Sequence, residues 1–131
     1  MSEHPPAPSD PRRRLARSFG YALRGLGMML RTQANARLHA TAMVLAVAAG
    51  FWFHISHVEW CAVVAAIGLV WTAEGLNTAI EAVVDLVSPE RHPLAGRAKD
   101  VAAGAVLCAA LAALAVGALI FGARVWALAT E

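Results

Sequence analysis

Residues 101–121 read VAAGAVLCAALAALAVGALIF, a run of apolar and small side chains that contains no charge. At a rise of about 1.5 Å per residue, a helix of this length crosses the ~30 Å hydrocarbon core of a bilayer. The chain has 131 residues, of which 59% are hydrophobic, a higher share than soluble domains of this size carry. The sequence therefore predicts an all-α integral membrane protein.

Two segments upstream of this run also predict spanning helices. Residues 38–56 contain no lysine, arginine or acidic residue, and residues 60–73 are again uncharged. The second segment continues in helical register until Ser88-Pro89, because proline disfavours helical geometry in the residue before it and has no N–H to donate. We expect one transmembrane domain, residues 38–125, with three helices at about 38–56, 58–88 and 100–123.

The N-terminal part of the chain predicts two different elements. Residues 1–13 are rich in proline and lack apolar periodicity, which predicts a disordered tail. Over residues 14–37 the apolar side chains follow a helical period, while Arg17, Arg24 and Arg31 recur every seven residues on another side. This pattern predicts an amphipathic helix that lies on the membrane surface.

The basic residues gather on one side of the predicted membrane. Ten of the eleven Lys and Arg residues lie before residue 38 or between 91 and 99, and none lies in the 54–59 link. The positive-inside rule then places the N-terminus and the 88–100 loop in the cytoplasm, with the protein in a bacterial inner membrane. The small net charge of +2 favours the lipid bilayer over nucleic acid as the partner of this basic surface.

A polar stripe interrupts the second predicted spanning helix. At about 100° per residue, Glu74, Asn77, Glu81 and Asp85 fall within an arc of about 80° and share one face. Charged side chains inside a membrane are costly and mark functional sites. A buried carboxylate could accept a proton from a lipid hydroxyl, and one nearer to water could hold Mg²⁺. Spacing alone also allows residues that hold helices together or carry protons.

The chain contains no Walker-type phosphate-binding loop. The run GYALRG at 20–25 has the glycine spacing, but Leu26 and Gly27 follow where lysine and Ser or Thr are required. The phosphates of a nucleotide would therefore meet metal and isolated basic groups. The basic candidates, for which membrane anchoring is the alternative, are Arg14, Arg17, Arg24, Arg97 and Lys99.

The segments EGLNTAIEAVVD (74–85), SPERHPL (88–94) and AKDVAAGAVL (98–107) together resemble the prokaryotic diacylglycerol kinase family. The resemblance extends over residues 14–125 and leaves out only the proline-rich tail. It implies a homotrimer of three-helix subunits, each with a surface helix. It also implies transfer of the γ-phosphate of ATP to a lipid alcohol, with Mg²⁺ as cofactor, at sites shared between neighbouring subunits.

The resemblance also implies a role for individual residues. Glu74 would be the general base, Asn77 its polar neighbour and Glu81 a metal ligand. The nucleotide contacts that it implies are Arg14, Tyr21, Glu90, His92, Lys99 and Asp100. The lipid substrate is expected to meet Glu74, Arg17 and Arg24.

One position departs from the family. Where the family has a glutamate as second metal ligand on the surface helix, the run TQANARLH at 32–39 places Gln33. A neutral amide binds Mg²⁺ more weakly than a carboxylate does. Three alternatives follow: Gln33 coordinates the metal through its carbonyl oxygen, another group such as Asp85 compensates, or activity is reduced or lost.

The choice of lipid is a separate question, because undecaprenol and diacylglycerol both present a primary hydroxyl. The run LNTAIE continuing into LVSPE is more similar to family members that act on undecaprenol. We therefore expect undecaprenol as the substrate, with diacylglycerol as the alternative. A non-catalytic or proton-handling membrane protein is the alternative from another functional class.

Overall fold

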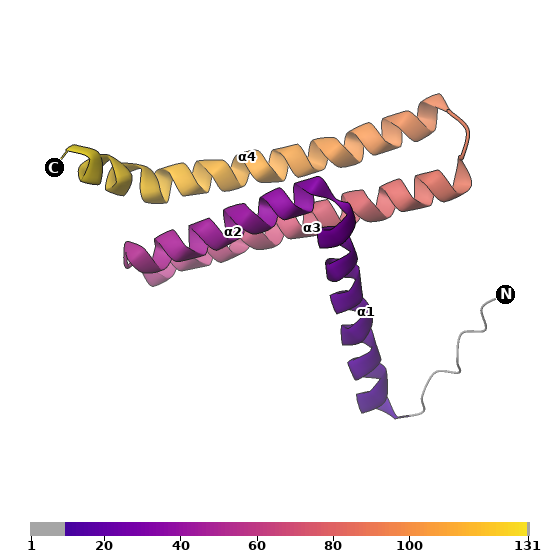
Figure 1. Ribbon diagram of the computed structural model, residues 1–131, viewed down its shortest axis with the longest axis horizontal. Coiled ribbons are helices and arrows are strands. Elements are labelled where there is room, and N and C mark those ends of the chain that lie inside the picture. The colour runs from indigo at the N-terminus through magenta and orange to yellow at the C-terminus, as the bar shows by residue number, and fades with distance from the viewer. Residues whose placement is uncertain (1–9, 131) are drawn as a thin grey trace.

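The computed structural model describes residues 10–130, and four α-helices account for nearly all of them. They are α1 (Pro11–Thr32), α2 (Ala34–Trp52), α3 (His57–Val87) and α4 (Pro93–Thr130). Helices α2, α3 and α4 run alongside one another with α3 packed against both neighbours, while α1 leaves this bundle sideways (Figure 1). The all-α prediction is confirmed.

The junction between α1 and α2 lies earlier than the sequence predicted. Helix α1 begins at Pro11, where the Asp10 side chain accepts the N–H of Arg12 at 3.0 Å, and it ends before Gln33. Gln33 has extended backbone (φ −102°, ψ 121°), so the helical path turns there rather than at 37. A one-residue break leaves the apolar spacing on both sides intact, which is why periodicity did not reveal it. The predicted disorder of the tail concerns residues 1–9, which lie outside the described part, and residues 11–13, which are helical.

The turn between α2 and α3 is short and tightly packed. Gly50 allows the close approach of the two helices, because a Cβ there would lie 2.7 Å from the Trp60 ring. His54 takes a positive φ of 48° within the turn. A buried cluster of Ile55, Val63 and Ile120 lies at this end of the bundle, remote from the polar part of α3.

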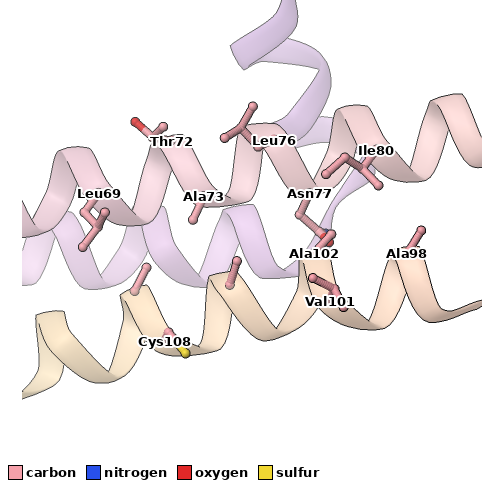
Figure 2. A pocket seen from close by; sticks show the side chains of 12 residues that line it. Leu69, Thr72, Ala73, Leu76, Asn77, Ile80, Ala98, Val101, Ala102 and Cys108 are labelled. Atoms are coloured by element: carbon pink, nitrogen blue, oxygen red, sulfur yellow. The ribbon is translucent and has the colours of Figure 1, made fainter.

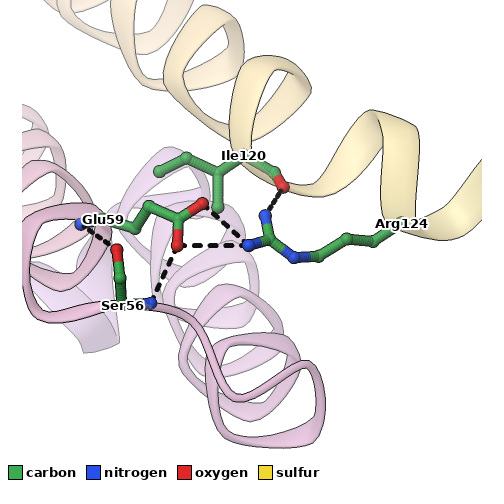
Figure 3. Close-up of polar contacts among 4 residues, drawn as sticks. All are labelled: Ser56, Glu59, Ile120 and Arg124. Atoms are coloured by element: carbon green, nitrogen blue, oxygen red, sulfur yellow. Dashed lines mark hydrogen bonds and ion pairs between the residues drawn. The ribbon is translucent and has the colours of Figure 1, made fainter.

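Polar contacts join this turn to the C-terminal part of α4 (Figure 3). The Ser56 hydroxyl accepts the Glu59 N–H and the Glu59 carboxylate accepts the Ser56 N–H at 2.8 Å, which is a capping box at the start of α3. Arg124 on α4 pairs with Glu59 at 2.9 Å and donates to the Ile120 carbonyl. We call the group of Ser56, Glu59 and Arg124 the end clamp. Three tryptophans lie near this end of the bundle: Trp52 at the end of α2, Trp60 near the start of α3 and Trp126 near the end of α4.

The link between α3 and α4 is shorter than the predicted 88–100 loop. Helix α3 ends before Ser88-Pro89 as expected, but α4 already begins at Pro93. Proline is well suited to the first turn of a helix because its missing N–H would have no partner there. The charge of residues 97–100 suggested a loop, although charged residues form helices readily outside the apolar core. Lys99 and Asp100 therefore lie on α4, which is longer at both ends than the predicted 100–123.

Two of the described helices, α3 and α4, are long and apolar enough to cross a membrane. Their outward faces carry large apolar side chains, such as Leu114 and Leu119 at 69% and 84% exposure, which suit contact with lipid. Helix α2 does not reach the same mean hydropathy, and Asn35, Arg37 and His39 in its first turns are the polar residues responsible.

Candidate active site

Glu74 and Asn77 are the buried polar side chains of the described chain, at 1% and 7% exposure. Both lie on α3, one turn apart, near the middle of the bundle. Met29 of α1 is buried beside them, with its sulfur 3.7 Å from the position that a Cβ on Gly75 would take. The end of α1 therefore covers this part of α3, and the junction at Gln33 brings it there.

The Glu74 carboxylate lies close to a histidine of α2. Its Oε2 lies 4.0 Å from Nε2 of His39 on α2, and the side chains of the two residues are 2% and 15% exposed. Oε2 makes no hydrogen bond within residues 10–130, and the Thr78 hydroxyl donates to the backbone carbonyl of Glu74 rather than to its carboxylate. An unpaired buried carboxylate oxygen costs free energy. Such unpaired groups are rare in folded proteins, and a functional role is one explanation for them.

Asn77 lies between Glu74 and Glu81 on the polar stripe and binds Glu81. Its Nδ2 donates to Oε1 of Glu81 at 3.1 Å, while its Oδ1 is buried and has no partner. Figure 2 shows the Asn77 side chain directed from α3 toward α4 near Ala102. It lines an apolar pocket between these helices, with Leu69, Leu76 and Ile80 of α3 among the other lining residues. The stripe on one face is thus present at Glu74, Asn77 and Glu81.

Asp85 has a different partner. Its Oδ1 accepts a hydrogen bond from Nζ of Lys99, so an ion pair bridges α3 and α4 close to their link. Both side chains remain accessible, at 66% for Asp85 and 37% for Lys99. The structure therefore joins a residue of the acidic stripe to a predicted nucleotide contact.

The metal ligands predicted by the resemblance are only partly assembled. Gln33 is half-buried at the α1–α2 junction, where its N–H donates to the Met29 carbonyl at 2.8 Å. Within residues 10–130, no three His, Cys, Asp or Glu side chains lie close enough together to hold a metal ion. Glu81 uses Oε1 for Asn77, and its Oε2 is the oxygen that fits Mg²⁺. One or two carboxylates suffice for Mg²⁺ when substrate phosphates and water complete its octahedral shell, so this donor set fits the ion.

The predicted nucleotide and lipid contacts fall into two separate groups. Arg14, Arg17, Tyr21 and Arg24 are exposed on α1, which points away from the α3–α4 link (Figure 1). The Arg24 guanidinium lies 4.7 Å above the Tyr21 ring, an attractive cation–π arrangement. The second group, at the link and the start of α4, consists of Glu90, His92, Lys99 and Asp100. One chain does not bring the two groups together.

Sequence reasoning missed the contact of His39 with Glu74 and that of Asp85 with Lys99. A signal for the first was available, because α2 and α3 are joined by a short turn and run antiparallel. His39 lies thirteen residues before the end of α2 and Glu74 seventeen after the start of α3, so their depths in the bundle are similar. Counting residues from the turn gives only the depth of each side chain in the bundle. Which side of α2 faces α3 depends on how the helices pack.

Comparison with known proteins gives consistent results. The model of the family described as prokaryotic diacylglycerol kinase matches residues 20–121. The chain is 43% identical over 108 residues to undecaprenol kinase of Bacillus subtilis, covering 82% of this chain and 88% of that protein. It is 37% identical over 101 residues to diacylglycerol kinase of Escherichia coli K12, covering 77% and 83%. A diacylglycerol kinase of Synechocystis is 44% identical over 101 residues, covering 76% of this chain and 58% of that protein.

Proposed function

The chain belongs to the prokaryotic diacylglycerol kinase family, and we propose that it transfers the γ-phosphate of ATP to the primary hydroxyl of undecaprenol. Family membership confirms the expectation of a membrane lipid kinase. The observation that carries the proposal is Glu74, a carboxylate at 1% exposure whose Oε2 has no partner, on the same helix face as Glu81.

The reaction follows from the depths of these two carboxylates. Glu74, among apolar side chains, takes the proton from the lipid hydroxyl, and the resulting oxygen attacks the γ-phosphorus. The bond from that phosphorus to the β–γ bridging oxygen breaks, and ADP leaves. Glu81 and the nucleotide phosphates would hold Mg²⁺, which would neutralise charge on the phosphoryl group. Asn77 fixes the orientation of Glu81 through its hydrogen bond.

The site is completed by a neighbouring subunit in this proposal. Helix α1 carries Arg14 and Tyr21 away from Lys99 and Asp100 of the same chain, so nucleotide contacts from both groups require two subunits. A homotrimer with α2, α3 and α4 spanning the membrane supplies them. The N-terminus and the α3–α4 link then face the cytoplasm of a bacterial inner membrane, where ATP is available.

The identities to known relatives favour undecaprenol over diacylglycerol as the substrate. The Bacillus protein named undecaprenol kinase is 43% identical with 88% of its length covered, whereas the Escherichia coli diacylglycerol kinase is 37% identical. The Synechocystis diacylglycerol kinase, at 44% identity, is the reason to keep diacylglycerol as a second candidate.

The test is a phosphorylation assay on the purified full chain in bicelles. Labelled ATP and Mg²⁺ are supplied with undecaprenol or with diacylglycerol, and kcat/KM is measured for each lipid. We expect transfer to both alcohols, with the higher kcat/KM for undecaprenol. A higher kcat/KM for diacylglycerol would reverse the choice of lipid. The absence of transfer to either lipid would refute the kinase and leave a proton-handling role for the acidic stripe.

A further inference from the structure

Glu74 has to lose a proton after each turnover. As general base it ends the reaction as a neutral carboxylic acid, and it cannot act again in that form. Its side chain is 2% exposed, so the described part of the chain shields it from water. A neighbouring group that accepts the proton would solve this problem.

His39 is the neighbour suited to this task. Its Nε2 lies 4.0 Å from the unpartnered Oε2 of Glu74, about 1 Å more than a hydrogen bond, which a ring rotation or one bridging water closes. Its side chain is 15% exposed against 2% for Glu74, so it stands between the carboxylate and the surroundings. It also lines the apolar groove between α2, α3 and α4, whose lining does not include Glu74.

The other charged groups around this pair are engaged elsewhere. On α2, the Arg37 guanidinium donates to the carbonyls of Leu30 and Arg31 at the end of α1. On α3, Glu81 is bound to Asn77, which does not titrate.

The remaining two helices contribute no proton acceptor at this point. Helix α1 presents the thioether of Met29. Helix α4 presents Ala102 and Val106 in its buried positions, and its Lys99 is paired with Asp85. Within the described chain, His39 is therefore the group that can receive the proton of Glu74.

We propose that His39 is a positioning residue that resets Glu74, taking up on its Nε2 the proton that Glu74 removed from the lipid hydroxyl. This inference rests on the proposed function. The transfer converts the carboxylic acid and neutral imidazole into carboxylate and imidazolium, and the opposite charges stabilise each other at this distance. The imidazolium then releases a proton to water and returns to the neutral tautomer whose Nε2 is unprotonated, ready for the next turnover. The net result of a turnover is one proton moved from the lipid hydroxyl to solvent.

The experiment compares His39→Gln with the wild type as full-length protein in bicelles, using labelled ATP and lipid alcohol. A matched control is His57→Gln, at the opposite end of α3 and exposed. We expect His39→Gln to lower kcat by about 10- to 100-fold with KM for ATP and lipid nearly unchanged, because proton transfer alone is impaired. His57→Gln should keep the wild-type values.

The pH dependence distinguishes proton transfer from a structural role. Protonated His39 cannot accept a proton, so wild-type kcat should fall on the acid side of its pH profile. In His39→Gln this fall in kcat should shift along the pH axis, because the side chain at position 39 no longer takes up a proton. Imidazole in the buffer should restore part of the kcat of His39→Ala.

Each outcome separates the two proposals. A wild type that phosphorylates no lipid refutes the proposed function. An active wild type whose kcat does not fall on the acid side of the pH profile overturns the role of His39, and this measurement needs no variant. An active His39→Gln with wild-type kcat and pH profile also overturns it, as does a variant whose loss lies entirely in KM.

Discussion

At Glu74, a carboxyl group that costs free energy to bury lies in the middle of a helix bundle, and its Oε2 has no hydrogen-bond partner among residues 10–130. Asn77 has an unpaired buried oxygen one turn away. Two unsatisfied polar atoms on adjacent turns destabilise the fold, since each loses its interaction with water and gains no partner. In the proposed function a substrate would satisfy these atoms, and the substitutions below test this at single residues.

Glu74→Gln removes the base while keeping the size and polarity of the side chain. We expect kcat to fall by about 10²- to 10⁴-fold, the usual contribution of general acid–base catalysis. Size-exclusion chromatography should give the same oligomer as the wild type. A Glu74→Gln variant with an unchanged rate would contradict the role of this residue.

Gln33→Glu places a carboxylate at the position where the resemblance implies a metal ligand. We expect half-maximal activity at a several-fold lower Mg²⁺ concentration, because a charged oxygen binds this ion more tightly than an amide. The measurement is a Mg²⁺ titration of the initial rate at constant ATP. An identical titration curve for the two proteins would mean that residue 33 does not contact the metal.

Among the elements, the helices themselves were the most predictable feature of the chain. The uncharged run at 101–121 predicts a helix because its length matches the thickness of a bilayer. The end of α3 at Ser88-Pro89 is predicted because proline restricts the backbone of the residue before it. The break at Gln33 and the early start of α4 were not predictable, because neither disturbs the apolar period. Pairs such as His39 with Glu74 depend on how two helices rotate about their axes, which one sequence does not specify.

The end clamp contributes to the stability of the helix ends. Arg124→Ala removes its ion pair with Glu59, whereas Glu59→Ala also removes half of the capping box at Ser56. We therefore expect both variants to lower Tm, and Glu59→Ala to lower it more. Lipid kinase activity should be retained at low temperature in both, because the clamp is remote from Glu74. Equal Tm values for the two variants would show that the capping box does not stabilise α3.

Gly50→Ala tests the close approach of α2 and α3. The new methyl group would meet the Trp60 ring at 2.7 Å and Ile55 at 3.2 Å, so the turn must shift. We expect a loss of about 1 to 3 kcal/mol in unfolding free energy, the usual effect of overpacking. Gly122→Ala is the matched control at the same end of the bundle, since its Cβ would meet nothing within 4 Å, and it should keep the wild-type stability. Equal stabilities of the two variants would argue against tight packing at Gly50.

At the level of the whole molecule, one chain supplies the parts of a site without bringing them together. The residues on α1 and those at the α3–α4 link are separated because α1 leaves the bundle sideways (Figure 1). A shared site predicts complementation between two inactive variants. Glu74→Gln and Arg14→Ala, mixed in equal amounts before the proposed trimer assembles, should restore activity at about a quarter of the sites if each site draws one of these residues from each of two subunits. No recovery in the mixed trimers would place both residues in the same subunit's site.

The three tryptophans near the end clamp also determine what optical spectroscopy can report. Trp52, Trp60 and Trp126 lie at the end of the bundle opposite to the α3–α4 link, and only Trp71 lies nearer the middle. Their ultraviolet emission will therefore respond to lipid thickness and headgroup polarity at that boundary and hardly at all to nucleotide. The single tyrosine, Tyr21, lies on α1 under a guanidinium, so its phenol vibrations offer a separate signal from this helix. One unlabelled sample thus contains two probes, one at an end of the helix bundle and one on α1.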